Sequence, residues 1–177
     1  MHRQRGFTLI ELSMALAIAA IVFALAASAV GALADRARIA RLQTELSAVF
    51  IDSARQAVAG GVAVVLCPAG TGRSGCADGF DWSDGWLAFA DRDGDRHFSD
   101  GDAALVRVGP PGDGLRLLTS RGRPKIVFQP DGDSAGSNAT FVFCSKHGRS
   151  GTLMLSNAGR FRVAQRHPTL SAECTNN

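Results

Sequence analysis

Basic side chains that could bind phosphate gather near the C-terminal end of the sequence. Arg160 and Arg162 are two residues apart, so in a β-strand both would point to the same face. Further cationic residues that could join this face are Lys146, His147, Arg149, Arg166 and His167. Residues 115–177 hold nine basic and three acidic residues. Such a face predicts weak, salt-sensitive and sequence-independent contact with the phosphates of double-stranded DNA. A solvated polar strand face is the alternative.

Carboxylates cluster in the middle of the chain. Asp91, Asp93 and Asp95 alternate along the sequence, and Asp102 lies eleven residues after the first of them. This spacing is similar to that of a calcium loop, although the glycine stands at the fourth place and an aspartate replaces the usual glutamate at the twelfth. A calcium site at these four residues and an acidic turn between two strands both stay open. No other cofactor is expected.

Catalytic residues are not expected. The histidines at positions 2, 97, 147 and 167 show no spacing to a serine or cysteine nucleophile that a known catalytic motif requires. The chain is therefore expected not to be an enzyme.

A long apolar segment precedes all of these residues. Residues 12–30 are apolar or small except for Ser13 and Ser28, which is about the ~20 residues that a membrane-spanning helix needs. Arg3 and Arg5 stand before this segment, and Asp35 is the first acid after it. The positive-inside rule then places the N-terminus in the cytoplasm and the residues after about 35 on the other side of the membrane.

Four cysteines lie in the exported part of the chain, where disulfides can form. Three pairings are open. We favour Cys67–Cys76, which closes a short glycine-rich loop, and Cys144–Cys174, which ties the C-terminal residues to a strand. A zinc site is the alternative, but the cysteines are not paired as C-x-x-C and no histidine has ligand spacing to them.

The pattern of apolar residues predicts an α+β fold. Residues 35–59 continue the apolar helix with a stripe of apolar residues at three- and four-residue steps, and Gly60 and Gly61 end it. Short apolar runs separated by glycine, proline and aspartate predict strands at 62–67, 85–90, 104–109, 115–120, 125–130, 139–144, 152–157 and 159–165. We expect a long N-terminal helix packed on one or two antiparallel sheets.

The start of the apolar segment carries a carboxylate, Glu11, that neither a signal peptide nor an ordinary membrane anchor explains. The sequence GFTLIE at 6–11, with basic residues before it and apolar ones after it, resembles the leader of type IV pilins and type II secretion pseudopilins. The resemblance implies that a prepilin peptidase cuts between Gly6 and Phe7 and methylates the new N-terminus at Phe7. Glu11 would then be the fifth residue and attract the N-terminus of a neighbouring subunit during assembly.

This resemblance also implies how the chain is divided. Residues 1–6 would be the leader peptide, 7–34 a transmembrane helix that becomes the filament core, and 35–177 a periplasmic pilin domain. The protein would cross the bacterial inner membrane once, and then enter a pilus or pseudopilus with other pilins as partners.

The rest of the chain resembles the GspH/FimT family of minor pilins and pseudopilins, through segments such as VAVVLCP (62–68), WSDGWLAFADRDGD (82–95), IVFQPDG (126–132) and LSNAGRFRV (155–163). The pattern Gly159-Arg160-Phe161-Arg162 is similar to the G-R-x-R of FimT-like minor pilins, which are implicated in binding DNA during natural transformation. The resemblance implies a minor type IV pilin near the pilus tip. The minor pseudopilin H of type II secretion is the alternative.

Overall fold

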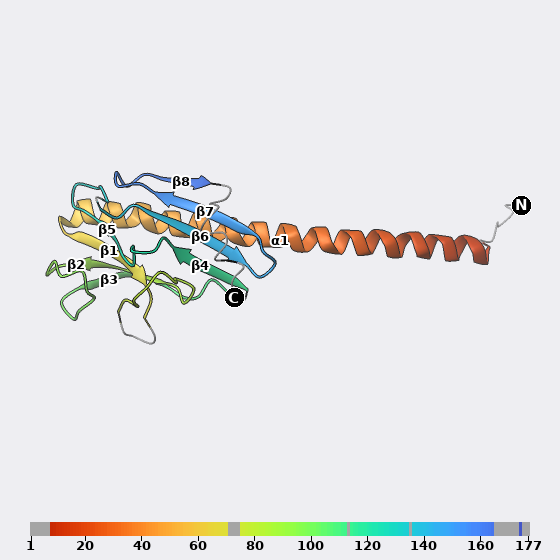
Figure 1. Cartoon of the computed structure of the whole chain (residues 1–177), viewed down its shortest axis with the longest axis horizontal. Coiled ribbons are helices and arrows are strands. Elements are labelled where there is room, and N and C mark those ends of the chain that lie inside the picture. Colours follow the sequence, from red (N-terminus) through yellow and green to blue (C-terminus); the bar gives the residue numbers. More distant parts are fainter. Residues whose placement is uncertain (1–7, 71–74, 113, 135, 165–173, 175–177) are drawn as a thin grey trace, which may run out of the picture. The chain divides into compact units, whose positions relative to one another are not determined.

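The computed structural model describes residues 8–70, 75–112, 114–134, 136–164 and 174, and for residues 25–29 it describes the backbone alone. Within these residues, one long helix is followed by eight strands (Figure 1). They are α1 (Leu9–Gly60), β1 (Ala63–Pro68), β2 (Trp86–Asp91), β3 (Ala103–Val108), β4 (Leu115–Thr119), β5 (Ile126–Phe128), β6 (Ala139–Ser145), β7 (Ser150–Leu155) and β8 (Phe161–Ala164). Each strand begins and ends within two residues of the range that the sequence predicts.

Two compact units divide the chain, Met1–Ala37 and Arg38–Asn177. The described part of the first unit is helix from Leu9 onward, and its exposed large apolar side chains include Leu9, Ile10, Leu12, Met14, Leu16, Ile18, Ile21, Val22, Phe23, Val30 and Leu33. Within the described residues, no helix has both the length and the hydropathy that a membrane crossing needs. The assignment of 7–34 as a transmembrane helix stays a prediction.

The end of α1 is set by two glycines. Gly61 has a φ of 66°, a left-handed conformation that glycine adopts without a steric penalty. Its N–H donates to the carbonyl of Ala57 at 2.9 Å and so satisfies one of the last carbonyls of the helix. The helix therefore ends where the sequence predicts.

Two antiparallel four-stranded sheets form the second unit, in the orders β3-β2-β1-β5 and β4-β6-β7-β8. The C-terminal part of α1 contributes Leu46 and Phe50 to a core shared with both sheets. The ring of Phe50 lies 5.9 Å from that of Phe128 in β5 and 5.4 Å from that of Phe141 in β6. This arrangement confirms the predicted α+β class and shows that there are two sheets.

Both disulfides cover the sheet faces that point away from this core. Cys67 is bonded to Cys76 beside a second apolar cluster, on the face of β1 opposite to that of Val64 and Leu66. Cys144 of β6 is bonded to Cys174, which packs against a third cluster on the outer face of the other sheet. These are the two pairs that we favour from the sequence.

Candidate functional site

The N-terminal end of α1 is held by a reciprocal set of hydrogen bonds. The N–H and the hydroxyl of Thr8 each donate to Oε2 of Glu11, both at 3.1 Å, and the N–H of Glu11 donates to Oγ1 of Thr8 at 3.3 Å. This is a capping box, in which a threonine before the helix and an acid three residues later satisfy each other's free backbone donors. Glu11 is therefore exposed at the beginning of the helix and is already hydrogen-bonded within its own chain.

The predicted cleavage site, Gly6 and Phe7, lies outside the described residues. Thr8 is the first described residue, and the helix begins directly after it at Leu9. The sequence analysis assigned no role to Thr8, although the T-x-x-E spacing of Thr8 and Glu11 predicts a capping box.

Arg160 and Arg162 lie on the hairpin between β7 and β8, and both are exposed. Phe161 between them is partly buried, and its ring lies 6.1 Å from that of Phe50 in the core. Because side chains alternate along a strand, the two arginines lie on the face opposite to that of Phe161. Among the described residues, neither arginine side chain makes a hydrogen bond or an ion pair, so both guanidinium groups can bind a ligand.

Gly159 fixes the turn that leads into Arg160. Its φ is 69°, and a Cβ at this position would lie 3.0 Å from the carbonyl oxygen of Gly132. The turn is further tied to the loop before β6, because the N–H of Ser134 donates to the carbonyl of Asn157 at 2.9 Å and the Ser134 hydroxyl donates to that of Ser156 at 2.8 Å. The missing side chain of Gly159 thus allows the hairpin to approach the neighbouring loop, and the hydrogen bonds of Ser134 hold the two together.

Lys146 and Arg149, two further basic residues predicted for this face, lie at the other end of β7. Arg162 pairs with Met154 at the end of β7, whereas Lys146 and Arg149 stand in the turn before β7 begins. Met154 is five positions after Arg149 along the chain, about 17 Å at about 3.3–3.4 Å per residue of strand. Arg166 lies outside the described residues. The described basic residues of the predicted patch therefore form two groups, of which only Arg160 and Arg162 lie on β7–β8.

The acidic segment forms a turn between β2 and β3. Carboxylate oxygens of Asp91, Asp93 and Asp95 lie within 4.8 Å of one another, the only such group among the described residues, and Asp102 is outside it. Both oxygens of Asp102 are engaged, one by the N–H of Arg92 at 3.0 Å and the other by the N–H of Ser99 at 2.8 Å. The carboxylates thus cap backbone donors within the turn, as aspartates commonly do.

The pKa values of Asp91 and Asp102, the two carboxylates that flank this turn, are shifted in opposite directions. Burial raises the pKa of Asp91, against the hydrogen bonds from the N–H groups of Arg96 and Gly94. Burial also opposes the charged form of Asp102, but hydrogen bonds from Arg92 and Ser99 outweigh it and lower the pKa of Asp102. The carboxylates of the turn are thus engaged by backbone N–H groups, and calcium binding stays a prediction.

Comparisons with known proteins agree with this arrangement of helix, sheets and leader. Residues 46–159 match the family described as Type II transport protein GspH, and residues 1–27 match the prokaryotic N-terminal methylation motif. No curated protein sequence matches the chain significantly.

The chain is similar in fold to a solved minor pilin. The type IV minor pilin FimU of Pseudomonas aeruginosa aligns with a TM-score of 0.54 and 20% identity, over 73% of this chain and 90% of that chain. The minor pseudopilin EpsH of the Vibrio cholerae Type 2 Secretion System aligns with a TM-score of 0.49 and 11% identity, over 72% of this chain and 97% of that one. Because the family match covers more than half of the residues and the methylation motif precedes it, the chain belongs to the GspH family of minor pilins and pseudopilins.

Proposed function

We propose that this protein is a minor subunit of a type IV pilus, anchored in the bacterial inner membrane before assembly and located near the pilus tip afterwards. The observation that carries the proposal is the exposed apolar surface of α1 within the first unit. In the sequence, the basic residues Arg3 and Arg5 and the carboxylate of Glu11 precede the apolar residues 12–30. Exposed apolar area of this extent is rare in a free soluble protein and calls for lipid or for other helices as its surroundings.

Glu11 is the residue proposed to guide assembly. After cleavage between Gly6 and Phe7, the new ammonium group of one subunit and the Glu11 carboxylate of its neighbour would each be costly to bury alone in a helical bundle, and far less costly as a pair. Since Oε2 of Glu11 accepts two hydrogen bonds from Thr8, the carboxylate stays oriented at the helix start until that pairing takes place.

A type II secretion pseudopilin is the alternative, since the family includes both. Deletion of the gene separates the two. Loss of surface pili, with secretion of exoproteins unchanged, is expected if the chain is a pilus subunit. Loss of secretion with normal piliation would assign the chain to the secretion machine instead.

DNA contact is a further part of the proposal and rests on Arg160 and Arg162. The two guanidinium groups are exposed and unengaged among the described residues, and the anchored hairpin holds them at one place. Two phosphate contacts give only weak binding, because each adds a modest electrostatic term that salt screens. We therefore propose sequence-independent binding with micromolar or weaker affinity.

Salt dependence tests the DNA proposal on a fragment of residues 35–177. With two phosphates contacted, the logarithm of the binding constant should fall against the logarithm of the salt concentration with a slope of about −1.8, from about −0.9 per phosphate. Arg160→Gln with Arg162→Gln should abolish most of this slope. Arg55→Gln with Arg92→Gln removes the same charge from exposed positions outside the hairpin and serves as the control.

Two results would contradict DNA binding through the hairpin. The first is equal binding by the hairpin variant and the control variant, which would show that net charge alone is responsible. The second is the absence of binding by the parent fragment even at low salt. Either result leaves the proposed role in filament assembly intact.

A further inference from the structure

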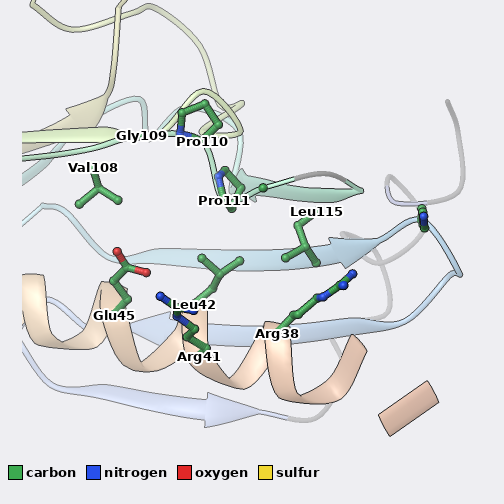
Figure 2. A pocket seen from close by; sticks show the side chains of 11 residues that line it. Arg38, Arg41, Leu42, Glu45, Val108, Gly109, Pro110, Pro111 and Leu115 are labelled. Carbon is green, nitrogen blue, oxygen red and sulfur yellow. The ribbon is translucent and has the colours of Figure 1, made fainter. Parts of the chain in front are cut away.

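A groove of about 610 Å³ opens between α1 and the segment that joins β3 to β4. Figure 2 shows Arg38, Arg41 and Glu45 on the helix side, with Val108 and the two prolines facing them. The lining residues are Arg38, Arg41, Leu42, Glu45, Val108, Gly109, Pro110, Pro111, Gly112, Leu115 and Lys146. All of them belong to the second compact unit.

The groove is electropositive. Arg38, Arg41 and Lys146 are exposed cations, and Glu45 is the only acid in the lining. Among the described residues, no side-chain hydrogen bond or ion pair occupies any of the three cations. Their charges are therefore available to a ligand.

The shape of the groove suits a peptide segment. Pro110 and Pro111 form one wall, and because proline fixes φ, this wall keeps its shape when a partner binds. Buried Leu42 and Leu115 supply an apolar base between the charged side chains. Protein–protein interfaces commonly have an apolar centre surrounded by polar and charged residues, as this groove does.

We infer that this groove receives an acidic segment of the neighbouring subunit in the filament. The inference rests on the proposed function, because it requires that the chain is built into a filament. Opposite charges across such a contact would fix its register and exclude wrong partners.

The chain itself has the charge separation that such a contact needs. The groove begins at Val108, the last residue of β3, whereas the exposed acids Asp93, Asp95 and Asp100 precede the first residue of β3. Six residues of strand lie between them, so the acidic turn and the basic groove are at opposite ends of β3. A head-to-tail contact between two subunits with this polarity is heterologous, because the basic groove of one subunit meets an acidic segment of the next.

Photo-crosslinking in cells that assemble the filament tests the inference on the full chain. A photoreactive phenylalanine analogue at Pro110, which is exposed at the groove, should crosslink to another subunit. The crosslinked peptide, identified by mass spectrometry, should carry an acidic cluster. Arg38→Glu with Arg41→Glu should lower the yield of this adduct by about tenfold, since like charges across the contact repel.

Arg36→Glu with Arg55→Glu is the matched control, because it makes the same change of charge at two exposed arginines of α1 that do not line the groove. It should leave the adduct unchanged. If the chain is present in sheared filaments but gives no adduct, or gives adducts only with lipid or with non-acidic peptides, the inference is wrong while the proposed function stands. Absence of the chain from all filaments would contradict both.

Discussion

Gly151 of β7 packs directly against side chains of α1. A Cβ at this position would lie 2.5 Å from Cγ2 of Ile39 and 2.9 Å from Nε2 of Gln43. The amide of Gln43 also donates to the carbonyl of Thr152 at 3.2 Å, a buried hydrogen bond that ties the helix to the strand. The missing side chain of one glycine thus sets the spacing between the helix and the sheet.

Gly151→Ala should therefore lower the free energy of unfolding of the fragment 35–177 by about 1–3 kcal/mol, because neither the β-branched Ile39 nor the hydrogen-bonded Gln43 can move away freely. Urea denaturation followed by circular dichroism measures the change. Gly101→Ala is the control, since its nearest contact would be Oγ of Ser99 at 3.7 Å, and it should change stability by less than about 0.5 kcal/mol. Equal stability of the two variants would contradict the close approach.

Asp102 makes the acidic turn sensitive to pH. Its pKa is lowered in the folded state from the usual 3.8, so its contribution to stability is present above 3.8 and is lost as the pH falls through the folded-state value. The destabilisation caused by Asp102→Asn should therefore be larger at pH 6 than at pH 3, measured by urea denaturation. Asp100→Asn, a change of an exposed acid that makes no hydrogen bond among the described residues, should show no such trend. Equal destabilisation by Asp102→Asn at both pH values would contradict this role.

At the scale of elements, the sequence predicts all eight strands because alternating apolar residues and glycine-rich breaks are local signals. The order of the strands within each sheet is not encoded by such local signals. β4 follows β3 along the chain but pairs with β6 in the other sheet, and this pairing depends on contacts between residues far apart in the sequence. Periodicity therefore predicts where strands lie but not which strands are neighbours.

The same limit applies to the candidate sites. The common face of Arg160 and Arg162 follows from a two-residue period and could be predicted. The separation of Lys146 and Arg149 from that face depends on the register of β7 with β8, which no short motif encodes. The groove was missed for the same reason, because Arg38 and Arg41 meet Pro110 only after the helix has packed on the sheets.

Each disulfide joins a strand to a segment outside the core, so their loss should act on separate elements. Cys144→Ser with Cys174→Ser should lower the free energy of unfolding by about 2–4 kcal/mol. The Cys67–Cys76 disulfide closes a smaller loop, with a sequence separation of 9 against 30 for Cys144–Cys174. Its removal by Cys67→Ser with Cys76→Ser should therefore cost less on the entropic account of disulfides. Peptide mapping without reductant should recover only these two pairs. Free thiols or a different pairing would contradict the disulfide arrangement.

At the scale of the whole molecule, the chain combines two parts with different surroundings. The second unit buries a core shared by α1 and two sheets, and this is the part that matches the GspH family. The first unit exposes apolar side chains along its helix, and Thr8 and Glu11 cap the N-terminal end of that helix. This division suits a subunit that leaves a membrane to enter a filament, because one apolar surface can contact lipid first and neighbouring helices later.

Mass spectrometry of the mature N-terminus tests this account most directly. The protein purified from its native membrane or filament should begin at a methylated Phe7. Gly6→Val should block cleavage, because the peptidase requires a small residue there, whereas Glu11→Ala should be cleaved normally but be depleted from sheared filaments. A mature protein that begins near Ala29 would instead show an ordinary signal peptide, and it would contradict both the assembly role of Glu11 and the placement of α1 in a filament core.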